Sequence, residues 1–461
     1  MTAPHVDITS PKGTTMPELA KPLAQFILET RPAALPKDVW HEGKRTFLNW
    51  LGCVLGGCQD HAVSLALGVL RELAGQGQSI VIGRNTSLDM GSAAFLNAMS
   101  ANVHSYNDTH LKTVCHPTGP VAAAIFAFSE RNRISGADFM TALIVGIEME
   151  CRMSLLLTAP PARCALGLNM TGFTGGFGAA AAVGRLIGLN QAQMIHALGV
   201  AATHASGLRE GNTVMSGKIN SAQAARSGLT AALLAAKGFT SSETMLEGPT
   251  GFAQVFAIDA NFTAALDGLG SQYEVLNNMP KPFPCGIVIH PVIDACLRIT
   301  KELDGGPEQI DRVELVVPRL ALELTGIREP RTTFDAQCSL YHLTAATLLH
   351  GKAGLAELSE ECVGDPTVID LRRRVHAVAE PVVAKDEAKA TLFLKSGRTH
   401  TAHVQHCRGS RENPMTDADL EEKFSEQSVM GLPGRNPKEL IERCWAIDRL
   451  DDMRALARLL G

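Results

Sequence analysis

The chain has 461 residues, of which 45% are hydrophobic, 19% charged and 5% aromatic, a balance typical of a globular protein with two or three domains. Its formal net charge of −5 argues against a nucleic-acid or membrane-surface partner, because both favour a strong basic excess. The sequence has neither a recognisable signal peptide nor an apolar run clean enough to span a bilayer, so we expect a cytoplasmic protein.

The segment before the α+β region reads as one helix after another. Residues 1–14 are polar and rich in Pro and Thr, which predicts a flexible tail. From residue 15 to about 270, apolar side chains recur at helical spacing, as in Leu19, Leu23 and Ile27. The run from Gly175 to Gly184 consists mainly of Gly and Ala, which favours a central buried helix because small side chains let helices approach closely.

The pattern changes after about residue 271. Polar and apolar residues alternate over 311–318, 375–380, 389–395 and 399–404, which predicts strands, the last two joined by a turn at 396–398. Helices are predicted over 291–303 and 340–349, and again from residue 413 to the C-terminus. We therefore predict a mainly α fold: a discontinuous all-helical domain, residues 15–270 plus 410–461, with a smaller α+β lid domain inserted at 271–409.

Eleven cysteines are scattered from Cys53 to Cys444. No CxxC pair occurs, and no Cys/His group has the sequence spacing of a zinc site. This pattern favours reduced, buried thiols and no metal, and it argues against an iron–sulfur cluster, which needs closely organised thiolates.

The densest group of polar residues lies between His104 and Pro120 and lacks helical periodicity. Loops on a rigid frame often carry catalytic groups, and Asp, His and Lys together can bind a carboxylate and move a proton. A solvated His-rich loop is an equal alternative, and a metal site is a third, although the histidine spacing matches no standard motif. The candidate side chains in this loop are Tyr106, Asp108, Thr109, His110, Lys112 and His116.

Three further segments carry weaker signals. Lys218 follows a Gly-rich loop that begins at Arg209, where a helix N-terminus could help to bind an anion. Lys281 begins a Pro-rich segment, and Tyr341 and His342 lie where a helix is predicted to begin. For each segment alone, a surface lysine or a core histidine or tyrosine is the simpler interpretation.

Taken in order, these blocks resemble the MmgE/PrpD family along nearly the whole chain after the tail. The matching blocks are YNDTHLKTVCHP, NMTGFTGGFGAAAAVGRLIGLNQAQMIHALGVA, ARSGLTAALLAAKGFTSSETMLEGPTGF, KPFPC with HPVIDA, and RENPMTDADLEEKF. The resemblance implies a helical domain with an α+β lid, a homodimer, and acid–base chemistry at a carbon next to a carboxylate without a cofactor or a required metal. Members include 2-methylcitrate dehydratase, cis-aconitate decarboxylase and iminodisuccinate epimerase.

Residues carry over unevenly. Asp108, Thr109, His116 and Lys281 match the family pattern. Several positions depart from it. Ser105 stands where decarboxylase-like members have an Asp, Gly286 where they have a His, and Asn169 where many members have a His. The family's Lys aligns with Gly217, one residue before Lys218, and its later Tyr aligns with His342, one residue after Tyr341.

These departures weaken dehydration and decarboxylation, because both need a leaving group to be escorted away. We therefore expect an epimerase or isomerase of a small amino- or imino-dicarboxylate, similar to iminodisuccinate epimerase. The alternatives are a 2-methylcitrate dehydratase-like hydro-lyase, a cis-aconitate decarboxylase-like lyase and a non-catalytic binding protein. The expected catalytic set is Asp108, His110, His116, Lys218, Lys281, Tyr341 and His342; the expected substrate-binding set is Tyr106, Thr109, Lys112, Asn169 and Arg209.

Overall fold

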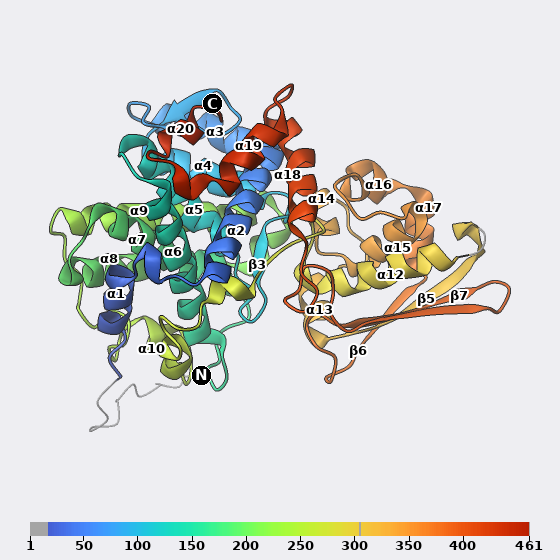
Figure 1. Ribbon diagram of the computed structural model, residues 1–461. Helices are drawn as coiled ribbons and strands as arrows, with labels where there is room; N and C mark the ends of the chain where they lie inside the picture. The colour runs from blue at the N-terminus through green and yellow to red at the C-terminus, as the bar shows by residue number, and fades with distance from the viewer. Residues whose placement is uncertain (1–16, 304–305, 461) are drawn as a thin grey trace.

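A computed structural model describes residues 17–303 and 306–460 of the chain (Figure 1). The predicted flexible tail, residues 1–14, lies outside the described residues. The fold is mainly helical with small sheets, which confirms the predicted fold class. Two hydrophobic cores are present: one lies in a large helical lobe, and the other lies in a smaller lobe that also holds a four-stranded sheet.

The helical lobe contains long helices joined by short connections. Two short strands, β1 (Ser79–Val81) and β2 (Thr86–Leu88), pair as an antiparallel hairpin on its surface. Its helices are α1 (Ala20–Glu29), α2 (Lys37–Gly57), α3 (His61–Leu73), α4 (Met90–Asn102), α5 (Thr118–Arg131), α6 (Gly136–Thr158), α7 (Met170–Ile187), α8 (Gln191–Thr203), α9 (Ile219–Ala236), α10 (Phe252–Phe256), α11 (Phe262–Leu266), α18 (Asp417–Gly431), α19 (Pro437–Trp445) and α20 (Arg454–Ala457).

Helix α7 is the predicted Gly/Ala-rich helix, and it is central and buried as expected. Every residue from Met170 to Gly184 is buried, and the helix packs between α6 and α9. A Cβ atom at Gly178 would come within 2.6 Å of the carbonyl oxygen of Gly146 on α6, and one at Gly228 on α9 within 2.5 Å of the carbonyl oxygen of Gly176. The small residues are therefore what allows these three backbones to pack closely.

The smaller lobe contains a sheet in the order β6-β5-β7-β8, in which β5 and β6 are parallel and the other neighbours antiparallel. Its elements are β5 (Ile310–Val317), β6 (Val375–Ala379), β7 (Ala388–Leu394), β8 (Thr399–Val404), α12 (His290–Glu302), α13 (Arg319–Thr325), α14 (Thr333–Ala336), α15 (Leu340–His350), α16 (Glu360–Gly364) and α17 (Pro366–Arg373). The four predicted strands and both predicted helices are confirmed, each within one residue of its expected ends.

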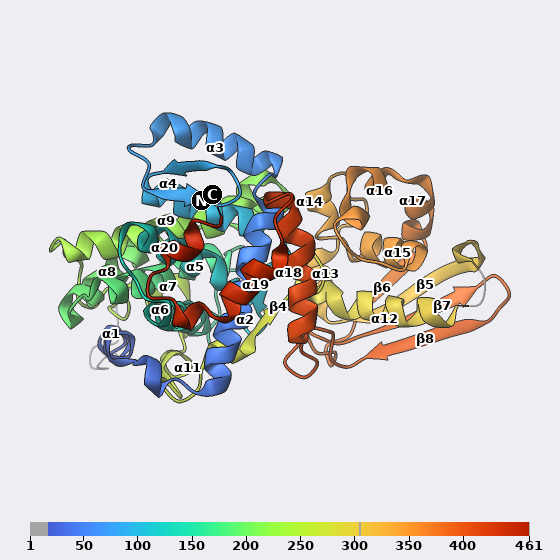
Figure 2. The same ribbon diagram turned by 45° about the horizontal axis from the view of Figure 1, so that its top comes forward.

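Helices α12 and α15 cover one face of this sheet (Figures 1 and 2). The alternating residues Val313, Leu315 and Val317 of β5 are buried against them, as the period-two pattern of the sequence requires. The chain reverses between β7 and β8 at Gly397, whose φ of 85° favours glycine. The predicted hairpin is therefore confirmed.

The two lobes are joined by segments that are far apart in sequence. Strand β3 (Asp108–His110) pairs antiparallel with β4 (Asn278–Pro280), the linker into the smaller lobe. Helix α18 then returns after that lobe and packs on α2. The polar loop predicted between helices thus lies between α4 and α5 and contains one short strand.

All eleven cysteines lie among the described residues and are free thiols, nine of them buried, in agreement with the predicted reduced state. Across residues 17–303 and 306–460, no single helix has both the length and the apolar character needed to cross a membrane. Helices α2 and α3 meet these criteria only as a pair, with an 84° bend between them.

Candidate active site

A cavity of about 110 Å³ lies where the two lobes meet. Five residues of the predicted site line it: His116, Asn169, Arg209, Lys218 and Lys281. The smaller lobe contributes mainly apolar walls from Ile287, Val288 and Leu324. The complete lining is Asn102, Ser105, Val114, His116, Asn169, Met170, Thr171, Arg209, Asn212, Gly217, Lys218, Asn220, Lys281, Gly286, Ile287, Val288, Leu324, Thr325 and Cys338, and none of these described residues carries a carboxylate.

The backbone explains why distant segments share this cavity. Pairing of β3 with β4 brings Lys281 beside the loop, where its N–H donates to the carbonyl oxygen of Asn107 at 3.1 Å. The first turn of α7, Met170 and Thr171, lines the cavity, as do Lys218 and Asn220 at the start of α9. Two helix N-termini therefore border the cavity, and their exposed N–H groups favour an anion there.

Two buried lysines provide the main positive charge. Lys218 Nζ donates to Gln337 Oε1 at 2.9 Å, and Lys281 Nζ donates to the Ser105 carbonyl oxygen at 3.1 Å. Burial lowers the pKa of Lys218 to about 8, and the nearby charge of Lys281 lowers it further. Burial also lowers the pKa of Lys281 to about 8. Neither lysine has a carboxylate partner among the described residues, so a bound carboxylate would supply the missing counter-charge.

His116 lies in the cavity as a neutral imidazole. Its Nδ1 donates to the carbonyl oxygen of Asp108 at 2.7 Å, and Thr109 Oγ1 lies 3.2 Å from the same nitrogen. Burial, followed by the charge of Lys281, lowers the pKa of His116 to about 3. With the proton fixed on Nδ1, Nε2 carries a lone pair that can accept a proton from a substrate.

Two donors without a hydrogen-bond partner in the described part of the chain also lie at the cavity. Arg209 Nη1 and Asn220 Nδ2 are buried and have no hydrogen-bond partner among the described residues. Asn169 caps α7 by accepting from the Gly172 N–H at 3.0 Å, and its amide donates to Asn212 Oδ1 at 3.3 Å. Because a buried N–H without a partner is costly, these donors indicate that a ligand with oxygen acceptors belongs in the cavity.

Asp108 and Thr109 lie next to the cavity rather than on its surface. Asp108 Oδ2 accepts from Asn278 Nδ2 at 2.6 Å, from the Thr118 N–H at 3.2 Å and from the Thr118 hydroxyl. The carboxylate thus holds β3 against the first turn of α5, while the Asp108 carbonyl orients His116. Asp108, expected among the catalytic residues, therefore contacts the cavity only through the histidine that its carbonyl orients.

The remaining predicted residues do not line the cavity. His110 is buried and bonds Glu274 Oε2 at 2.9 Å, while Lys112 reaches the same oxygen at 3.4 Å from the surface. The Tyr106 hydroxyl donates to the Pro282 carbonyl oxygen at 3.2 Å.

Tyr341 and His342 belong to the core of the smaller lobe. Tyr341 packs under the guanidinium of Arg328, and His342 Nε2 lies 2.7 Å from the carbonyl oxygen of Glu357. Their predicted catalytic roles would therefore need a rearrangement of α15 that brings them to the cavity.

Several residues at or near the cavity carry no local sequence signal. Lys423, from α18, is buried and donates to Asn49 Oδ1, the Tyr106 carbonyl oxygen and the Lys281 carbonyl oxygen at 2.7, 2.7 and 2.8 Å. It therefore fixes both chain segments that carry Ser105 and Lys281. The family-like block that ends in Lys423 and Phe424 was the one signal for it. The other polar residues that sequence reasoning missed are Asn102, Thr171, Asn212, Asn220 and Gln337.

Two groups of side chains bring potential metal ligands within 4.8 Å of one another: His110, Cys115 and Cys151, which are buried, and Asp386, His406 and Glu412, which are largely exposed. Neither group lines the cavity. Sequence spacing could not identify the group of His110, Cys115 and Cys151, because Cys151 lies on helix α6, outside the polar loop that carries the other two.

Comparison with known proteins gives the same assignment along most of the chain. The model of the MmgE/PrpD N-terminal domain matches residues 21–265, and that of the MmgE/PrpD C-terminal domain matches residues 283–447. Human cis-aconitate decarboxylase is 26% identical over 92% of this chain and 91% of the relative, and the mouse protein of that name is 26% identical over 80% and 78%. The Aspergillus terreus protein named cis-aconitate decarboxylase is 24% identical over 93% and 92%. Since the N-terminal model alone covers more than half of the sequence, the chain belongs to the MmgE/PrpD family.

Proposed function

We propose that this chain is a lyase that decarboxylates a small polycarboxylate, with chemistry like that named for its cis-aconitate decarboxylase relatives. The observation that carries the proposal is the cavity itself, in which Lys218, Lys281 and Arg209 face a neutral His116 with no lining carboxylate. Such a site favours a substrate with two or three negative charges.

The two walls of the cavity suggest how the substrate is oriented. The lysines, Arg209 and the two helix N-termini hold the carboxylates that remain in the product. The leaving carboxylate faces the apolar side chains Ile287, Val288 and Leu324. Loss of hydration there destabilises the charged carboxylate but has little effect on neutral carbon dioxide. This arrangement favours cleavage of the bond to that carboxylate.

The reaction needs one proton. When the carbon–carboxylate bond breaks, its electron pair stays on the substrate and is delocalised toward a remaining carboxylate held by a lysine. A protonated Lys218 or Lys281 then donates a proton to carbon and is reprotonated by water. His116 Nε2 accepts a hydrogen bond during this exchange.

Epimerisation of a small dicarboxylate is the second candidate, and one observation favours it. Four positions that depart from the family pattern, Ser105, Asn169, Gly217 and Gly286, all line the cavity. An epimerase needs only His116 to take a proton from one face and a lysine to return one on the other. The cytoplasmic location and the homodimer remain predictions.

Incubation with cis-aconitate in deuterated water separates these reactions. The lyase proposal predicts release of carbon dioxide and one carbon-bound deuterium in the product. Mass spectrometry and proton NMR detect the incorporated deuterium. Deuterium exchange of single-stereoisomer dicarboxylates without carbon dioxide would identify the epimerase instead. If a panel of small acids shows neither carbon dioxide release nor deuterium exchange, both enzyme proposals are contradicted and a binding protein is supported.

A further inference from the structure

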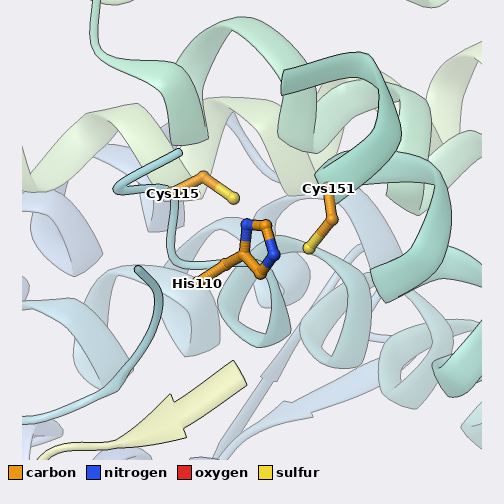
Figure 3. A group of neighbouring side chains, drawn as sticks. All are labelled: His110, Cys115 and Cys151. Atoms are coloured by element: carbon orange, nitrogen blue, oxygen red, sulfur yellow. The ribbon is translucent and has the colours of Figure 1, made fainter. Parts of the chain in front are cut away.

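A second group of reactive side chains lies behind the polar loop. His110 and Cys115 come from that loop and Cys151 comes from α6, and all three are fully buried (Figure 3). One ligand atom from each lies within 4.8 Å of the other two. None of the three lines the cavity, so the mechanism does not use them.

The imidazole of His110 is oriented by partners on both sides. Its Nε2 lies 2.9 Å from Glu274 Oε2, which is itself held by Asn277 Nδ2 at 2.8 Å. Its Nδ1 lies 2.8 Å from Thr113 Oγ1, which donates to Cys115 Sγ at 3.2 Å. A carboxylate that holds one ring nitrogen while the other faces thiols is the usual support of a metal-binding histidine.

The charges around the group also favour a cation. Glu150 is fully buried, and neither of its carboxylate oxygens has a hydrogen-bond partner among the described residues. A positive ion beside the neighbouring Cys151 would give this buried carboxylate a counter-charge.

We propose that His110, Cys115 and Cys151 form a structural zinc site that ties the polar loop to α6. Two thiolates and one imidazole are soft donors that select zinc over magnesium or calcium. Binding displaces the protons held by the two thiols and by the ring nitrogen that faces them, and these protons pass to solvent. It also draws the sulfur atoms toward the roughly 3.8 Å separation of a tetrahedral site with Zn–S bonds of about 2.3 Å. Thr113 Oγ1 or a water molecule completes the coordination. Because His116 follows Cys115 directly, the metal also fixes the loop that carries the catalytic imidazole.

Metal analysis of the full-length protein tests this site. After expression with added zinc and extensive dialysis, we expect about one zinc per chain by plasma mass spectrometry, and a large loss in Cys115→Ala and Cys151→Ala. Cys296→Ala removes an equally buried thiol in the smaller lobe, and His406→Ala removes a member of the exposed Asp386 group; both should keep their zinc.

Cobalt substitution of the wild-type protein gives an answer even if the cysteine variants fail to fold. A thiolate-to-cobalt charge-transfer band, lost on adding zinc, is expected. Absence of that band, zinc content unchanged in Cys115→Ala and Cys151→Ala, or a Cys115–Cys151 disulfide in the unreduced protein would each overturn the proposal.

Discussion

His110 and His116 lie six residues apart on one loop, but their rings have opposite surroundings. His116 meets the cavity, and its Nδ1 donates to a backbone carbonyl. Burial, followed by the charge of Lys281, lowers its pKa and keeps the ring neutral. His110 faces away from the cavity and is paired with Glu274. Burial alone would lower its pKa, but in the metal-free protein hydrogen bonds with Cys115 and Glu274 raise it to about 9, so zinc would bind this ring by displacing a proton.

The difference shows that burial, nearby charges and hydrogen-bond partners, rather than residue type or loop position, separate the proposed catalytic histidine from the proposed structural one. A backbone carbonyl fixes a tautomer without adding charge, whereas a carboxylate stabilises the charged ring. The same contrast applies to the lysines of the site: Lys281 is buried and lacks a carboxylate partner, whereas Lys112 is 55% exposed and bonds Glu274.

The largest effect is expected for Lys281→Met. Removing a buried charge that stabilises the reacting carboxylate should lower kcat/KM by about 10³-fold. Lys112→Met is the matched control on the other side of the loop and should change kcat/KM less than about twofold, because an exposed ion pair contributes little. Steady-state kinetics measures both variants. Equal losses of kcat/KM would contradict the distinction between the buried and the exposed lysine.

The two histidines should separate activity from stability. We expect His116→Gln to lower kcat by about 10²-fold with little change in Tm, since it removes a proton acceptor but leaves the packing. His110→Gln should instead lower the free energy of unfolding by about 3 kcal/mol, because it removes the buried ring that pairs with Glu274. Thermal unfolding and kinetics on both variants check this; a stable His110→Gln with lost activity would reverse the assignment.

The sequence predicts most of the fold because its patterns are local. The alternation of Val313, Leu315 and Val317 and the small residues of α7 each determine their own element. The site is less predictable, because it depends on contacts between segments about 170 residues apart. Lys281 reaches the loop only through the pairing of β3 with β4, and Lys423 only through the return of α18. Tyr341 and His342 show the reverse case: they lie where the family pattern has a Tyr, but α15 places them in the core of the smaller lobe.

Ser105→Asp would make the cavity resemble that of decarboxylase-like members. Ser105 has a φ of 51°, which Asp tolerates better than most residues, and its Oγ lies 3.5 Å from Lys218 Nζ. A carboxylate there should raise the pKa of Lys218 and compete with the substrate. We therefore expect KM to rise about tenfold, which corresponds to a loss of roughly 1.4 kcal/mol in binding free energy. Ser105→Asn, of nearly equal size, is the control; a similar KM in the two variants would contradict this electrostatic explanation.

A smaller effect is expected from pH. Lys218 and Lys281 have pKa values of about 8, so kcat/KM should fall as pH rises above 8 and both lose their charge. Bound carboxylates stabilise the charged amines, so the corresponding fall in kcat should lie at higher pH. Because these pKa values lie below that of an ordinary lysine, the empty protein should become more stable between pH 8 and 10. A kcat/KM that stays flat to pH 10 would exclude the lysines from binding.

Proton uptake on binding tests most directly whether the cavity is built for a polyanion. Tricarballylate, a saturated tricarboxylate with no double bond, can be titrated calorimetrically at pH 8 in buffers of different ionisation enthalpy. Each lysine is about half protonated at pH 8, so binding should take up about one proton in total. We expect this uptake to fall to near zero at pH 6, where both lysines are already charged, and to about half a proton at pH 8 in Lys281→Met. Absence of binding, or binding without proton uptake at pH 8, would contradict the assignment of Lys218 and Lys281 as the carboxylate-binding groups.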